Sequence, residues 1–184
     1  MVADLWGLMV ADVSKWERER IMIPLQRFRS LIGPSLVFNI VGAGEFMLPL
    51  FACLYWCLDQ HKCIAGIWLV PYNEVLNGCV KWLTQRPRPP WVDQRIELRA
   101  WSHEFSFPSS HSQLASALAL WFVLASHHPE ALTVTPTMPM VVFACLTGVS
   151  RVVLGLHYPS DVAVGEISLS LYLPACTPSP SLQL

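Results

Sequence analysis

Three short clusters between residues 81 and 161 combine basic, hydroxyl and imidazole side chains. The first runs from Lys81 to Arg88, the second is Pro-Ser-Ser-His at 108–111, and the third occupies 150–161. Arginine forks, a lysine ammonium group and N–H donors at the start of a helix stabilise a phosphoryl group during its transfer. The clusters therefore predict a site for a phosphate ester or anhydride.

We predict that five basic or hydroxyl residues bind the phosphate: Lys81, Arg88, Ser109, Ser110 and Arg151. Taken singly, each has an ordinary explanation. Cations at helix ends extend toward the membrane surface, and a serine before an apolar run often caps a helix. The occurrence of all five in one chain favours the phosphate site. Two histidines in the same clusters, His111 and His157, suit a two-step reaction that needs a nucleophile and an acid–base group.

Four apolar segments can carry the clusters, at residues 35–58, 63–84, 111–126 and 139–156. The first two reach the roughly 20 residues that span the hydrocarbon core of a membrane, the fourth comes close, and the third is shorter. A fifth run, 162–173, covers only about 18 Å of a core about 30 Å thick. If successive helices alternate in direction, the ends that hold the clusters meet at one face of the bundle.

The composition indicates a membrane protein. Of the 184 residues, 14% are charged and 53% are apolar, whereas a soluble domain usually carries about 25% charged residues. We predict one multi-pass integral membrane domain at 35–173 and a Pro- and Ser-rich, disordered tail at 174–184. Residues 1–34 form an amphipathic segment, which suits a helix at the membrane surface or a soluble helix with one buried face. The charge distribution does not indicate a nucleic-acid partner.

The clusters resemble the three-part signature of the PAP2 (phosphatidic acid phosphatase type 2)/haloperoxidase superfamily, in its membrane phosphatase branch. The signature reads K-x6-R-P, P-S-G-H and S-R-x5-H-x3-D, and ten of its eleven fixed positions occur here in order. The resemblance covers about residues 35–165. It departs at Ser110, where the family most often has a glycine that brings a backbone N–H close to the phosphate. Serine keeps that N–H, so we interpret the change as one of substrate shape and not as a loss of activity.

The resemblance implies an all-α transmembrane helical bundle of the PAP2 type, with four to five membrane helices and an N-terminal interfacial helix. It also implies that His157 attacks phosphorus to form a phosphohistidine, while His111 protonates the leaving group and then activates water. Asp161, one helical turn after His157, would hold the imidazole in the attacking tautomer. No metal or other cofactor is expected, because three cations supply the positive charge and no third zinc ligand is evident. The expected activity is metal-independent hydrolysis of a phosphate monoester or diphosphate, of a lipid or another small molecule.

Two alternatives are left open by the sequence. The short run at 162–173 would support His157 and Asp161 poorly, which suits a truncated, inactive relative of the family. A vanadate-dependent haloperoxidase shares the three clusters, although known examples are larger soluble helical proteins. A lipid phosphatase is favoured because the chain is small and apolar, and a site at the membrane face can take a headgroup while the acyl or prenyl chain stays in lipid.

Overall fold

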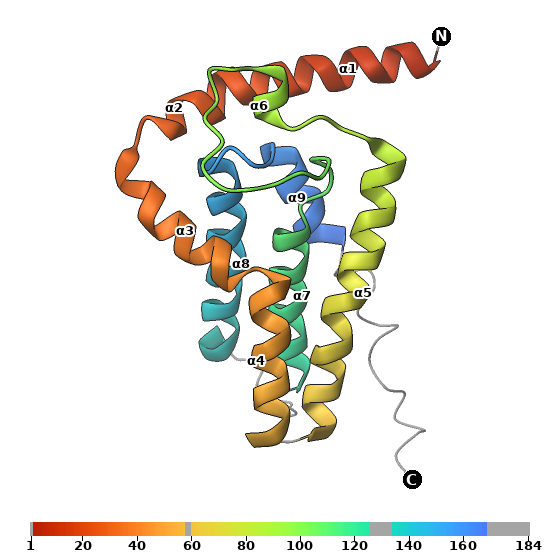
Figure 1. Ribbon diagram of the computed structural model, residues 1–184, viewed down its shortest axis with the longest axis vertical. Coiled ribbons are helices and arrows are strands. Elements are labelled where there is room, and N and C mark those ends of the chain that lie inside the picture. The colour runs from red at the N-terminus through yellow and green to blue at the C-terminus, as the bar shows by residue number, and fades with distance from the viewer. Residues whose placement is uncertain (1, 58–59, 126–133, 169–184) are drawn as a thin grey trace.

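Helices form every regular element in the part of the chain that the computed structural model describes, residues 2–57, 60–125 and 134–168 (Figure 1). The helices of the bundle are α3 (Ile32–Val41), α4 (Gly44–Cys57), α5 (Gln60–Thr84), α7 (Ser110–Ala125), α8 (Val134–Val153) and α9 (Pro159–Ser168). The N-terminal segment consists of α1 (Val2–Glu17), a π-helical turn (Arg18–Met22) and α2 (Ile23–Gln26), followed by a 3-10 turn (Arg29–Leu31). The short helix α6 (Pro89–Val92) lies in the loop between α5 and α7.

Helix α7 lies at the centre of the bundle, where it contacts α5, α8 and α9. Leu114 and Leu118 are four residues apart and therefore share one face of α7. They pack in a buried cluster with Phe51 of α4 and Leu69 of α5. Phe51 also meets Trp121 edge to face, with ring centroids 5.2 Å apart, a geometry that stabilises aromatic pairs. This packing fixes the neighbouring helices relative to α7, whose first turn belongs to the predicted site.

The segment predicted as one helix at 35–58 is in fact two helices, α3 and α4, joined at residues 42–43 with a bend of 53°. A Cβ atom at Gly42 would lie only 2.7 Å from Cγ2 of Thr147 in α8. The absence of a side chain at Gly42 thus lets the backbone at the end of α3 approach α8, while α4 packs along α5. The prediction of one helix was wrong because apolar content alone does not reveal such a contact between distant segments.

Three other predicted segments correspond to single helices, with ends that differ by a few residues: 63–84 to α5, 111–126 to α7 and 139–156 to α8. The run at 162–173 begins earlier, as α9, and its residues beyond 168 lie outside the described part, as does the predicted tail at 174–184. By length and composition, none of the described helices is sufficient on its own to cross a membrane. The bent pair of Arg29–Val41 and Gly44–Cys57 is sufficient together, and Met138–Val153 is a shorter apolar helix.

The N-terminal segment lies across the end of the bundle at which α7 begins (Figure 1). Met22 is fully buried and packs in a cluster with Ile96 of the loop and Tyr158 before α9. The side-chain amide of Gln26 donates to the carbonyl of Glu97 at 2.9 Å and accepts from its N–H at 3.0 Å. The segment therefore has one buried face that contacts both loop and bundle. The proposed domain boundary after residue 34 stays a prediction.

Glycine is required at the turn between α8 and α9. Gly155 has a φ of +74°, which is a left-handed conformation that glycine adopts without steric cost. A Cβ atom there would also lie 2.5 Å from the carbonyl oxygen of Glu97. The loop between α5 and α7 can therefore cross directly over the turn that carries His157.

Candidate active site

The three clusters meet at one end of the bundle, as alternating helix directions predict. Lys81 lies in the last turn of α5, His111 in the first turn of α7 and Arg151 in the last turn of α8. Arg88 and His157 lie in the loops that follow α5 and α8. All of these residues except His111 are almost completely buried. Side chains up to 76 residues apart in the sequence thus form one cluster of polar residues at this end of the bundle.

Side-chain hydrogen bonds hold the start of α7 in place. Asn77 of α5 donates to the side-chain oxygen of Gln113 at 2.7 Å. The hydroxyl oxygen of Ser109 accepts from the N–H of Ser112 at 3.4 Å, which is the geometry of a helix N-cap. The structure thus gives Ser109, one of the predicted phosphate ligands, the capping role that was its ordinary explanation. Its neighbour Ser110 lines the cavity beside the clusters.

A cavity of about 770 Å³ opens between the α3–α4 bend, α5 and residues 101–104. The predicted site residues in its wall are Lys81, Arg88, Ser110, His111 and Arg151. Other parts of the wall are apolar and include Ala43, Leu48, Val70 and Val75. Pockets for small molecules usually measure about 300–1,000 Å³. The cavity can therefore hold a phosphate together with part of an apolar group.

His157 lies between two guanidinium groups. Its Nε2 atom is 3.5 Å from Nη1 of Arg88 and 3.5 Å from Nη2 of Arg151, while its Nδ1 atom is 2.6 Å from the backbone oxygen of Ser106. A carbonyl only accepts and a guanidinium only donates, so these partners assign the proton to Nδ1 and leave the lone pair on Nε2. Burial lowers the pKa of His157 well below its ordinary value, and the charges of Arg151 and Arg88 lower it further. The imidazole is therefore neutral at neutral pH.

Asp161 lies close to His157 but is not hydrogen-bonded to its imidazole. Its Oδ2 atom is 3.8 Å from Nδ1 of His157, because the carbonyl of Ser106 occupies that position. The carboxylate instead accepts hydrogen bonds from the hydroxyl of Ser106 and from the N–H of Tyr158, the latter at 3.0 Å. Asp161 thus acts on the imidazole indirectly, by holding the residue whose carbonyl orients it.

The two arginines beside His157 are themselves held by fixed acceptors. Arg88 donates to the backbone carbonyls of Glu104 at 2.6 Å and Leu156 at 2.7 Å. Arg151 donates to the side-chain oxygen of Asn39 in α3. Burial lowers the pKa of Arg88 to about 10, so it stays charged at neutral pH. Preorganised cations of this kind stabilise an anion without having to rearrange.

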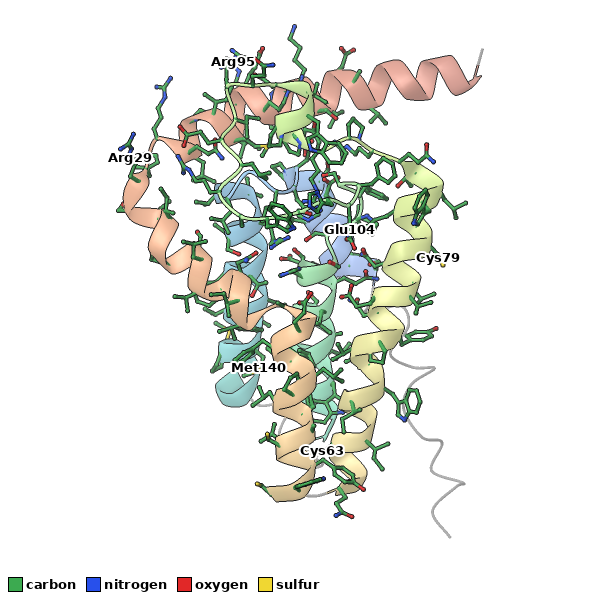
Figure 2. The ribbon with its side chains drawn as sticks, viewed as in Figure 1. Arg29, Cys63, Cys79, Arg95, Glu104 and Met140 are labelled. Carbon is green, nitrogen blue, oxygen red and sulfur yellow. The ribbon has the colours of Figure 1, made fainter. Side chains whose placement is uncertain are left out.

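Glu104 belongs to the site although the sequence did not predict it. Its carboxylate is 2.5 Å from Nζ of Lys81, and in Figure 2 it lies just beyond the start of α7. The hydrogen bond from Lys81 lowers the pKa of Glu104 against the opposing effect of partial burial, and the charges of Lys81, Arg88 and Arg151 add to this. A carboxylate therefore already occupies one side of the cation cluster. A single glutamate in a long polar loop carries no spacing signal that could have identified it.

Arg86 is a second site residue that the sequence did not single out. Its Nη1 atom donates to the carboxylate of Asp161 and to the hydroxyl of Ser160, the latter at 2.9 Å. Its Nη2 atom donates to the hydroxyl of Ser14 at 2.7 Å and to the carboxylate of Glu17 at 3.2 Å. The Arg-Pro-Arg-Pro run contains Arg86, but nothing in the sequence distinguishes it from the other arginines of the loop.

The model of the PAP2 superfamily matches residues 63–173, which is more than half of the chain. The chain belongs to the PAP2 superfamily. The matched residues contain all three clusters, so the resemblance that these clusters predicted is confirmed at the level of the family.

Relatives of this PAP2 chain include phosphatidylglycerophosphatase B of Bacillus subtilis, which is 30% identical over 141 residues, covering 72% of this chain and 66% of that protein. Decaprenylphosphoryl-5-phosphoribose phosphatase of Mycobacterium tuberculosis is 36% identical over 81 residues, covering 44% of this chain and 39% of that protein. The chain thus spans less than two thirds of the length of these relatives.

A similar solved structure is that of a transmembrane PAP2-type phosphatidylglycerolphosphate phosphatase from Bacillus subtilis. It has a TM-score of 0.68 and 24% identity, and the match covers 91% of this chain and 84% of that one. The predicted all-helical PAP2 fold is therefore confirmed. The family and the fold also support the prediction of a multi-pass membrane protein.

Proposed function

We propose that this PAP2 chain is a phosphatase that hydrolyses a phosphate monoester or diphosphate of a lipid through a phosphohistidine at His157. The observation that carries the proposal is the position of Nε2 of His157, which lies 3.5 Å from a guanidinium nitrogen of Arg88 and 3.5 Å from one of Arg151. The names of the two curated relatives support the substrate class, because both are phosphatases of lipid-linked phosphates.

In the proposed complex, the phosphate oxygens lie among Lys81, Arg88, Arg151 and the backbone N–H of Ser110. The arginines offer two parallel donors each, and the lysine adds a point charge. The substrate replaces the carboxylate of Glu104 at Lys81. The apolar part of the cavity wall takes the portion of the lipid next to its phosphate.

In the first step, the lone pair on Nε2 of His157 attacks phosphorus, and the bond between phosphorus and the leaving oxygen breaks. His111 gives its proton to that oxygen, so a monoester releases the lipid alcohol and a diphosphate releases the lipid monophosphate. The bond from Nδ1–H to the carbonyl of Ser106 keeps the ring turned toward the phosphate. Arg88 and Arg151 stabilise the charge on the equatorial oxygens.

In the second step, His111 takes a proton from a water molecule whose oxygen attacks the phosphorus of the phosphohistidine. The phosphorus–nitrogen bond breaks, its electron pair returns to Nε2 of His157, and inorganic phosphate leaves. His111 is protonated again, which prepares it for the next substrate.

Three fixed cations supply the positive charge that a divalent metal supplies in other phosphatases. We therefore expect hydrolysis to continue in the presence of a chelator.

The test measures release of inorganic phosphate by the purified chain in detergent micelles that contain EDTA and no magnesium. The substrates are phosphates of glycerol, polyprenyl and sphingoid lipids, together with a polyprenyl diphosphate. The wild type should release phosphate, and the rate of release by His157→Ala should be lower by a factor of at least about 1,000. Arg95→Ala is the control, because Arg95 is exposed and lies at the outer edge of the same end of the molecule (Figure 2).

Two results would reject the phosphohistidine mechanism: a requirement for magnesium, or full activity in His157→Ala. A folded wild type that releases no phosphate from any of these lipids would instead identify an inactive relative of the family.

A further inference from the structure

Glu17 is buried beside the site although it comes from the N-terminal helix α1. Only 3% of the residue is exposed. Its carboxylate accepts from the N–H of Ser160 at 2.6 Å, from the hydroxyl of Ser160 at 3.1 Å and from Nη2 of Arg86 at 3.2 Å. A buried carboxylate is tolerated when it is paired and hydrogen-bonded, and Glu17 meets both conditions. Because the family match covers residues 63–173, Glu17 lies outside the matched residues, whereas its partners Ser160 and Arg86 lie within them.

The guanidinium of Arg86 bridges two buried carboxylates, Glu17 on one side and Asp161 on the other. It also lies 4.1 Å from the centre of the Tyr158 ring, a distance suited to a cation–π contact. With donors directed to both carboxylates and one face against the ring, Arg86 is held in a single orientation. Glu17 supplies one of the two anionic partners that define this orientation.

The same hydrogen bonds lead from Arg86 to the nucleophile of the proposed reaction. Arg86 donates to Asp161, Asp161 accepts from the hydroxyl of Ser106, and the carbonyl of Ser106 accepts from Nδ1 of His157. Each contact in this series joins segments that are distant in the sequence. A change in the position of Arg86 therefore shifts Asp161 and Ser106, and through them the imidazole of His157.

Glu17 also changes the charge balance next to His157. With Glu17 present, one cation faces two carboxylates, so this group carries a net negative charge. Without Glu17, Arg86 would neutralise Asp161 alone. A net negative charge near Nδ1 stabilises the positive charge that develops on the imidazole when Nε2 attacks phosphorus. Loss of Glu17 should therefore slow the attack, even with the phosphate ligands intact.

We propose that Glu17 is a positioning residue for His157, and that the N-terminal segment thereby completes the active site of this chain. The inference rests on the proposed phosphatase function. Glu17 acts through Arg86 and Asp161 and does not touch the phosphate-binding cations, so it affects the rate of the reaction and not the affinity for phosphate.

The decisive variant is Glu17→Gln, which keeps the size of the side chain and removes its charge. Its matched control is Glu19→Gln, since Glu19 lies two residues further along and its side chain is 46% exposed. We expect kcat of Glu17→Gln to fall about 10-fold or more, as for other residues that orient a reacting group. The inhibition constant for inorganic phosphate should stay within about 2-fold of the wild type. Glu19→Gln should match the wild type in both quantities.

Thermal unfolding in the same detergent separates positioning from folding. If Glu17→Gln does not fold, Ser14→Ala takes its place, because it removes one acceptor of Nη2 of Arg86 and leaves both carboxylates. It should show the same separation of rate from phosphate affinity, with a smaller loss of kcat.

Unchanged kcat in a folded Glu17→Gln protein would overturn this inference alone, provided that the wild type is active and His157→Ala is not. A parallel loss of kcat, phosphate affinity and unfolding temperature would also overturn it, because this pattern indicates a role in folding only. An inactive wild type would overturn both this inference and the proposed function.

Discussion

Whether an imidazole can attack phosphorus depends on which of its two nitrogens carries the proton. At His157, the carbonyl of Ser106 accepts a hydrogen bond from the proton on Nδ1. Arg88 and Arg151 can only donate, so they leave Nε2 without a proton. The same arginines are the proposed ligands of the phosphate. One pair of cations therefore serves both to bind the substrate and to keep the nucleophile unprotonated.

This arrangement predicts an unusual pH dependence for phosphoenzyme formation. Burial, with Arg151 and Arg88, lowers the pKa of His157 well below 6.5, so Nε2 stays unprotonated as the pH falls through that value. On the acidic side, where protonation of Nε2 limits the attack, the rate should therefore decline only at pH values below 6.5. Single-turnover experiments between about pH 5 and pH 8, quenched with alkali to preserve phosphohistidine, measure this rate. A decline centred at or above pH 6.5 would contradict the effect of burial.

Glu104 is expected to compete with the substrate for Lys81. Glu104→Gln removes the competing charge, so the KM for a lipid phosphate should fall. The side chain of Glu104 is 64% exposed, and exposed ion pairs contribute only about 0.2–1 kcal/mol, which corresponds to a fall in KM of at most about 5-fold. Glu97→Gln is the control, because Glu97 pairs with Arg99 in the same loop. An equal or higher KM in Glu104→Gln would show that Glu104 does not compete.

Residues that occupy fixed positions in a motif could be predicted from the sequence, whereas the residues that hold them in place could not. Lys81, Arg88 and Arg151 were recognisable because each occupies a fixed place in a cluster. Asp161 was expected to hold the imidazole of His157, but the backbone carbonyl that accepts from Nδ1 could not be predicted. No pattern of side chains in the sequence reveals that a loop places a backbone carbonyl there.

At the scale of the elements, the turn between α8 and α9 must let the loop before α7 pass over it. Gly155→Ala would place a methyl group 2.5 Å from the carbonyl of Glu97 at a φ of +74°. We expect a loss of about 1–2 kcal/mol from the backbone conformation alone. A lower unfolding temperature and reduced phosphate release should both follow, because His157 lies two residues further on.

Gly78→Ala in α5 is the matched control for this turn, since a Cβ atom there has nothing within 4 Å. It should leave the unfolding temperature unchanged or raise it, because alanine favours a helix by up to about 1 kcal/mol over glycine. Equal unfolding temperatures for the two variants would mean that Gly155 is not required.

The helices themselves could be predicted from the apolar runs, but the bend between α3 and α4 could not. Hydropathy continues through residues 42–43, where the structure changes direction by 53°. At the bend, Gly42 approaches Thr147 too closely for any side chain to fit. Only the arrangement of α3 against α8 reveals that contact.

At the scale of the whole molecule, large apolar side chains cover the outside of the bundle. Exposed examples on α3, α4, α5 and α8 are Val37, Ile40, Trp56, Trp68, Val75, Val141 and Val149. We expect the chain to stay with the membrane fraction after an alkaline carbonate wash and to be released by detergent, because water cannot solvate this surface favourably. Release by carbonate alone would contradict integral insertion.

The meeting of the three clusters at one end of the bundle could be predicted, because helices that alternate in direction bring their ends together. The part played by residues 1–34 could not. An amphipathic pattern shows that one face is buried, but it does not identify what lies against that face. Here it is the loop and the start of α9, with Glu17 accepting from Ser160.

The carbonyl of Ser106 has a consequence for mutational screening. Every amino acid carries a main-chain oxygen, so no codon change at this position deletes the group that orients the imidazole. A scan that replaces side chains one by one would record position 106 only through its hydroxyl, and would not measure what the main-chain oxygen contributes. Replacement of the amide that follows residue 106 by an ester, which weakens the oxygen as an acceptor, would expose a dependence that conventional genetics cannot detect.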